Sequence, residues 1–85
     1  MNYQALYTDV GLWILEQQRQ AQQLGFGSAS YLDWVILSGG QLCDKYYNDN
    51  FVLKQVGFLW DHIDEALKKQ GRSTIHERVK RNQNI

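Results

Sequence analysis

The chain has 85 residues, 44% of them apolar and 13% aromatic, so it can build one small hydrophobic core but not two. Nine basic residues balance nine acidic ones, which excludes a uniformly basic nucleic-acid-binding protein. A single cysteine excludes an internal disulfide, and no apolar run is long enough for a membrane span or a signal peptide. We therefore expect a cytoplasmic protein with no membrane contact.

The first predicted element is a long helix over residues 2–24. The chain contains no proline, so no residue in this stretch lacks a backbone donor. Apolar side chains recur at the spacing of one helix face, and Leu6, Val10 and Trp13 lie at its centre. Gly25 is expected to end the helix, because glycine adopts the left-handed conformation of a helix C-terminus without a steric clash.

A shorter helix is predicted over residues 30–38. It should begin after Ser28 or Ser30, and Ser30 with Asp33 three residues later resembles a capping box. The sequence Ser38-Gly39-Gly40 is expected to end this helix, since glycine is a poor helix former. The helix would then act as a short bridge between its neighbours.

Residues 41–47 are ambiguous, because they could form one more helical turn or an ordered loop. A second long helix is predicted over residues 50–70, since Asn48-Asp49-Asn50 supplies residues that commonly cap helix N-termini. Gly71 is expected to close it. The two long helices should run roughly antiparallel in an all-α bundle.

A short basic helix is predicted to follow, from residue 75 to about residue 81, and Thr74 with Glu77 offers it a capping box. The main apolar stripes end before this helix begins. We therefore divide the chain into a helical body, residues 1–71, and a basic tail, residues 72–85, which is not a separate domain. Removal of the tail is expected to leave the body folded.

Charge is distributed unevenly along the chain. Residues 1–67 carry three basic and eight acidic side chains, whereas residues 68–85 carry six basic side chains and one acidic one. The neutral total therefore combines an acidic body with a basic tail. The tail, together with the two lysines that precede it, could contact nucleic acid or an acidic protein surface through six side chains. These are Lys68, Lys69, Arg72, Arg78, Lys80 and Arg81.

Some apolar residues fall outside the inward stripes of the long helices. Leu12 and Leu15 lie off the first stripe, and Phe51 and Phe58, seven residues apart, share a second face of the other long helix. Either a small core encloses them or they form an interface with a second copy or another protein. The leading hypothesis is a non-enzymatic, self-associating interaction module, and nucleic-acid binding through the tail is the alternative.

Catalytic and metal chemistry find little support. Cys43 with Asp44, or Asp61, His62 and Glu65, could be offered as ligands, but a zinc site usually needs more Cys and His than this chain has. A carboxylate beside Cys43 would raise the pKa of the thiol, which disfavours a nucleophilic thiolate. We expect no catalytic residue, no cofactor and no metal, and Cys43 is interpreted as a small buried residue.

The middle of the chain carries one recognisable pattern. It consists of Asp33-Trp34, then Ser38-Gly39-Gly40, Asp44, Tyr47 and Gln55. This pattern resembles that of short uncharacterised helical proteins of Gram-positive bacteria and their phages. The resemblance does not extend to the N-terminal helix or the basic tail. It implies a small intracellular accessory protein of mobile-element type, and it transfers no functional residue.

Overall fold

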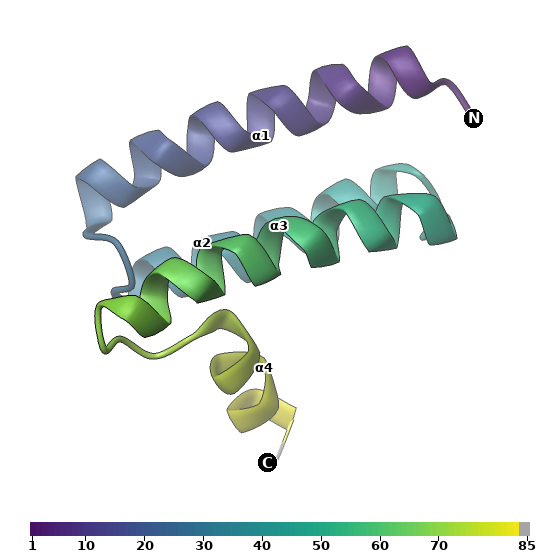
Figure 1. The fold of residues 1–85 in the computed structure, drawn as a ribbon. Coiled ribbons are helices and arrows are strands. Elements are labelled where there is room, and N and C mark those ends of the chain that lie inside the picture. The colour runs from purple at the N-terminus through teal and green to yellow at the C-terminus, as the bar shows by residue number, and fades with distance from the viewer. Residues whose placement is uncertain (84–85) are drawn as a thin grey trace.

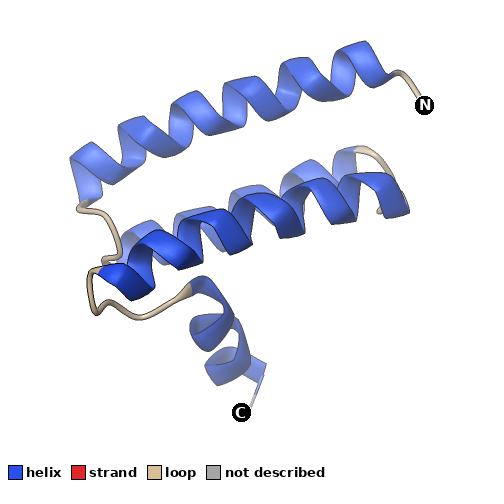
Figure 2. Cartoon of the chain, viewed as in Figure 1, coloured by secondary structure: helices blue, strands red, loops and turns tan. Residues whose placement is uncertain are grey.

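The computed structural model describes residues 1–83 and contains four helices (Figure 1). They are α1 (Tyr3–Leu24), α2 (Ala29–Lys45), α3 (Asn50–Lys69) and α4 (Ile75–Gln83). No strand occurs within residues 1–83, and loops alone join the helices (Figure 2). The all-α prediction is confirmed, together with the bounds of both long helices. The last two residues of the predicted tail lie outside the described residues.

The topology differs from the expected antiparallel pair of long helices. α2 runs back along the whole bundle, so α3 starts where α1 starts and the two long helices are parallel (Figure 1). The edge-to-face contact between Tyr3 and Phe51, each in the first turn of its helix, shows the same arrangement. The cause is the length of α2, whose 17 residues span about 25 Å rather than forming a short bridge.

α2 begins after Ser28, one of the two predicted starts, but its capping and its C-terminal end differ from the prediction. The N-cap is Ser28, whose side chain accepts a hydrogen bond from the Tyr31 N–H at 3.1 Å, so the expected Ser30–Asp33 capping box is wrong. Gly39 and Gly40 do not end the helix, which continues to Lys45. Most of the ambiguous segment 41–47 is therefore helical.

Gly39 serves a packing role inside α2. A Cβ atom at this position would lie 2.8 Å from two atoms of the Trp60 indole, Cζ2 and Nε1, so only glycine leaves room for the ring. The contact brings α2 and α3 close together at mid-length. The weak helix propensity of glycine is offset by this contact with a residue 21 positions further along the chain.

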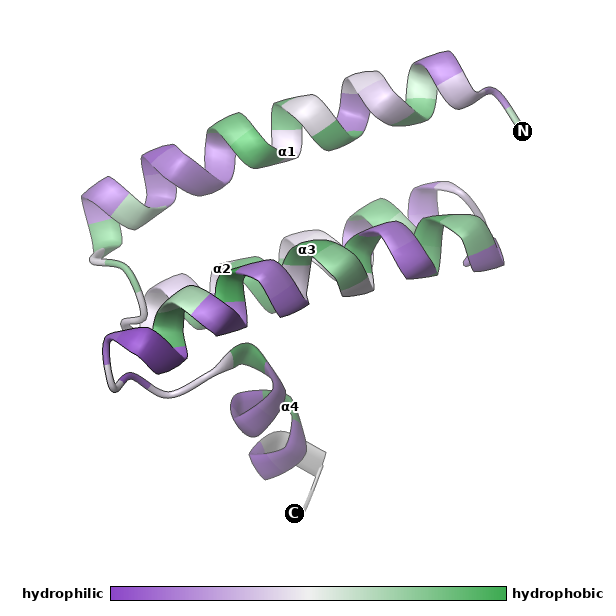
Figure 3. Ribbon diagram, viewed as in Figure 1, coloured by the Kyte–Doolittle hydropathy of each residue, from purple (hydrophilic) through white to green (hydrophobic). Residues whose placement is uncertain are grey.

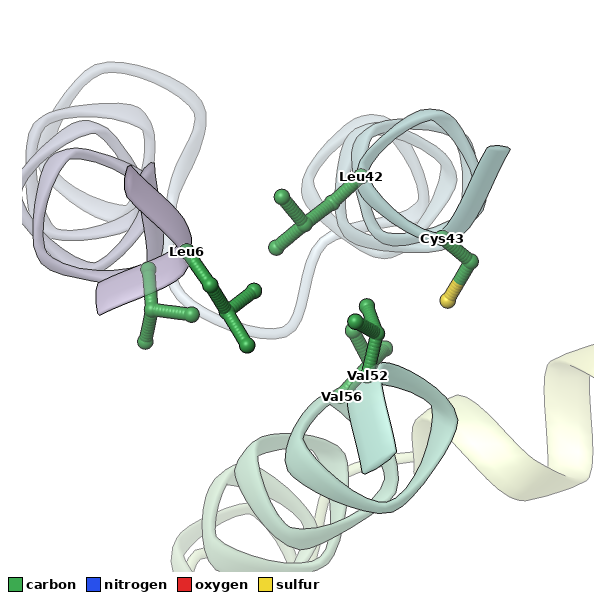
Figure 4. Packing of buried hydrophobic residues seen from close by; sticks show 6 residues of the cluster. Leu6, Leu42, Cys43, Val52 and Val56 are labelled. Carbon is green, nitrogen blue, oxygen red and sulfur yellow. The ribbon is translucent and has the colours of Figure 1, made fainter. Parts of the chain in front are cut away.

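Two groups of buried side chains form the core. At one end, Leu6 of α1, Leu42 and Cys43 of α2, and Val52 and Val56 of α3 point toward a common centre (Figure 4). At the other end α4 takes part as well. That second group comprises Tyr31, Leu32, Val35, Ile63, Leu67 and Ile75.

α4 is attached to the body, which corrects the expectation that residues 72–85 form a dispensable tail. Ile75 is completely buried, and its backbone N–H donates to the buried Asp64 carboxylate at 2.7 Å. The same carboxylate also accepts from the backbone N–H and the ring of His76. Thr74 caps the helix by accepting from the Glu77 N–H at 3.2 Å, as the capping-box pattern predicts.

Candidate functional site

Leu12 and Leu15 lie on the outer side of α1, opposite the buried Leu6 and Val10. Leu12 is 60% exposed and Leu15 is 63% exposed. The two side chains are three residues apart, so they are neighbours on the helix surface. The core therefore does not enclose this predicted pair.

Phe58 is 68% exposed on the outer side of α3, and it is likewise not enclosed. Phe51 behaves differently from the prediction that pairs it with Phe58. Its half-buried ring meets the edges of Tyr3 and Tyr7 with centroid separations of 5.3 and 6.4 Å, and it packs against the core. Phe51 is thus removed from the candidate interface, because the parallel arrangement of α1 and α3 gives it aromatic partners within the chain.

The seam between α1 and α3 is also partly apolar. Tyr7 and Ile14, seven residues apart on one flank of α1, are exposed, and the contact of Tyr7 with Phe51 shows that this flank faces α3. Tyr7 and Ile14 therefore border the seam, whereas Leu12 and Leu15 lie on the outer side of α1. We call Leu12, Leu15 and Phe58 together the outer apolar surface.

Two of the most exposed apolar residues were missed in the sequence. Leu37, on the outer side of α2, is 63% exposed, and Tyr47 is 94% exposed in the turn between α2 and α3. Tyr47 and Asn48 both have φ near +57°, which is uncommon for a bulky residue. Asn48 is a typical residue for this conformation, but nothing in the sequence predicts a positive φ at Tyr47.

The predicted basic residues do not behave alike. Arg78 is partly buried and forms a bidentate pair with Asp33 on α2, with distances of 2.6 and 3.0 Å. This pair lowers the pKa of Asp33, chiefly through the hydrogen bond from the guanidinium. Most of the α4 ribbon has the colour of hydrophilic residues in Figure 3. The other predicted basic side chains are exposed: Lys68, Lys69, Arg72, Lys80 and Arg81.

A polar cluster joins α1 to the C-terminal end of α2. Asp9 accepts a hydrogen bond from the Tyr46 hydroxyl at 2.5 Å and pairs with Lys45 at 2.9 Å. The hydrogen bond from Tyr46 is the main cause of the lowered pKa of Asp9, and the Asp9 carboxylate raises the pKa of Tyr46 to about 12. This cluster fixes the register of the two helices and shows no arrangement typical of catalysis.

The potential ligands do not converge on a metal site. Among the described residues, no three His, Cys, Asp or Glu side chains come together in a way that could hold a metal ion. His76 meets Asp61 and Asp64, whereas His62 is exposed on α3. Cys43 is buried, as expected, and its burial raises the pKa of the thiol, with a further contribution from Asp44.

Comparisons with protein-family models, with curated proteins and with solved structures find no match to this chain. The resemblance to proteins of Gram-positive bacteria and their phages therefore stays an expectation. None of the helices in the described part of the chain is both long and apolar enough to cross a membrane.

Proposed function

We propose that this protein is a non-enzymatic accessory module that self-associates through its outer apolar surface. The observation that carries the proposal is the 60–68% exposure of Leu12, Leu15 and Phe58, three large apolar side chains that lie outside the core. The buried, unpaired Cys43 suits a reducing compartment such as the cytoplasm.

The expected affinity follows from the apolar area that association would remove from water. Complete burial of a leucine or phenylalanine side chain contributes about 1.5–3 kcal/mol, and these side chains are already partly covered. In a twofold dimer each residue counts twice, which gives on the order of 6–12 kcal/mol before the cost of association. Because that cost is about 4–15 kcal/mol, these side chains alone give at most weak self-association, and contacts at the rim of the interface must add to it.

Charge complementarity between copies supports a second copy as the partner. The body is acidic, whereas the end of the bundle formed by the C-terminus of α3 and by α4 carries the excess of basic side chains. In an isologous dimer, the basic end of one copy can lie against the acidic body of the other. Weaker association at high salt would accompany such an arrangement.

Analytical ultracentrifugation of the purified protein at micromolar concentration tests the proposal. We expect a concentration-dependent dimer, and we expect Phe58→Asp to dissociate it while the helical circular dichroism signal is retained. Leu37→Asp is the matched control, because Leu37 is equally apolar and similarly exposed but lies on α2, outside the outer apolar surface. A strict monomer, or equal effects of the two substitutions, would refute the proposal.

The absence of enzymatic activity is part of the same proposal and has its own test. A binding module needs no cofactor, so native mass spectrometry after dialysis should detect only the mass of the polypeptide and its multiples. A metal ion or organic cofactor that survives dialysis would contradict this assignment.

A further inference from the structure

A hollow of about 230 Å³ lies between α4 and the beginning of α2, away from the outer apolar surface. Its walls come from two parts of the chain that are distant in sequence. One wall is Ser73 with Arg78 and Arg81, and the other is Gly27, Ala29 and Leu32.

Arg78 is held in a fixed position at this hollow. Its Nε and Nη2 atoms donate to the two oxygens of Asp33, which restrains the plane of the guanidinium. A guanidinium has five N–H donors, so the nitrogen that Asp33 does not engage still has two. Asp33 therefore orients Arg78 without using all of its donors.

Arg81 and Ser73 add further donors to the same hollow. Arg81 lies three residues after Arg78, on the same face of α4, and its side chain is exposed. Ser73 precedes α4 and has a hydroxyl that can donate a hydrogen bond. Arg72 borders the site, because its side-chain stem packs against Gly27. Two arginines, Arg78 and Arg81, thus line the hollow, and the carboxylate paired with Arg78 belongs to Asp33.

We propose that this hollow binds a phosphate group. Arginine forks match phosphate oxygens geometrically, and a fixed guanidinium loses less conformational freedom when it binds. One water occupies about 30 Å³ of liquid, so a hollow of about 230 Å³ can accept a phosphate together with bridging water. The group could belong to free phosphate or to a nucleic-acid backbone, and the same donors would bind either. This inference does not rest on the outer apolar surface, none of whose residues line the hollow.

A titration of the full chain with inorganic phosphate, followed by two-dimensional NMR at constant ionic strength, tests the site. We expect saturable shifts of the backbone signals of Gly27, Ala29 and Ser73. Arg81→Gln should weaken the affinity about tenfold, since it removes a charge-assisted hydrogen bond. Lys80→Gln is the matched control: it removes the same charge from the adjacent exposed residue, which does not line the hollow.

A second titration with a short single-stranded DNA distinguishes the two sources of phosphate. If the DNA shifts the same signals, depends on Arg81 and binds more tightly than inorganic phosphate, the site takes a backbone phosphate. If inorganic phosphate shifts these signals and DNA does not, the site takes a small phosphorylated molecule. The proposal is overturned if neither probe gives saturable shifts at these residues, or if Lys80→Gln weakens binding as much as Arg81→Gln does.

Discussion

Replacement of the two adjacent glycines of α2 by alanine should change stability in opposite directions. Both glycines lie in the interior of α2, so alanine gains about 1 kcal/mol of helix propensity at either position. At Gly40 a new Cβ meets no atom within 4 Å, and the full gain should appear. At Gly39 the new Cβ lies 2.8 Å from the Trp60 ring, and overpacking of this kind costs about 1–3 kcal/mol.

The difference between the two variants isolates this steric cost, because the gain in propensity cancels. We expect Gly40→Ala to be about 1–3 kcal/mol more stable than Gly39→Ala. For a domain of this size, 1 kcal/mol corresponds to about 4–8 °C in Tm, which thermal unfolding followed by circular dichroism resolves. Equal stabilisation of both variants would show that Trp60 does not pack on Gly39, and the arrangement of α2 against α3 would then be wrong.

Three further outcomes are expected. Ile75 is completely buried, so Ile75→Ala should lower the free energy of unfolding by about 2–5 kcal/mol in urea titrations. Lys80 is exposed on the same helix, so Lys80→Ala should change that free energy by less than about 0.5 kcal/mol. Similar values for the two variants would mean that α4 does not pack against the body. The neutral Tyr46 hydroxyl donates to Asp9, so its stabilising effect should be lost as the pH rises from 10 toward about 12. An ultraviolet titration should show tyrosine ionisation near pH 12 that decreases in Tyr46→Phe, while the buried Tyr31, whose pKa is also raised, still ionises late. Cys43 should react slowly with iodoacetamide until the chain is unfolded, and rapid modification of the native protein would contradict its burial.

Features that depend on neighbouring residues in the sequence could be predicted, and those that depend on distant partners could not. Gly25 and Asp49 sit at helix ends as expected, because capping is a local interaction. From the sequence alone Gly39 indicates the end of a helix, because the contact with Trp60 that explains this glycine joins residues far apart in the chain. Ile75 lies beyond the apolar stripe of α3, and Val79 is the one other apolar residue of α4. Its burial could not be predicted from the apolar spacing, because it depends on contacts with α2 and α3.

The candidate surfaces can likewise be divided into those that local spacing predicts and those that depend on distant residues. The exposure of Leu12, Leu15 and Phe58 could be anticipated, since each lies off the inward stripe of its own helix. Phe51 could not be assigned correctly, because its aromatic partners come from α1. The hollow beside Arg78 combines residues from opposite halves of the chain, and no motif in the sequence joins them.

The order in which the helices pack has a consequence for how rapidly the chain folds. α1 packs chiefly on α2, α3 packs on α2, and α4 packs on both α2 and α3, so most contacts join elements that are close in the sequence and the contact order is low. Helical domains of this kind fold in microseconds to milliseconds. Because the chain has no proline, refolding should also lack the phase of tens of seconds that prolyl isomerisation causes. The contacts of α1 with α3, such as Tyr3 with Phe51, and of α4 with α2, such as Arg78 with Asp33, join residues far apart in the sequence. Because closing such long loops costs entropy, these contacts should form last.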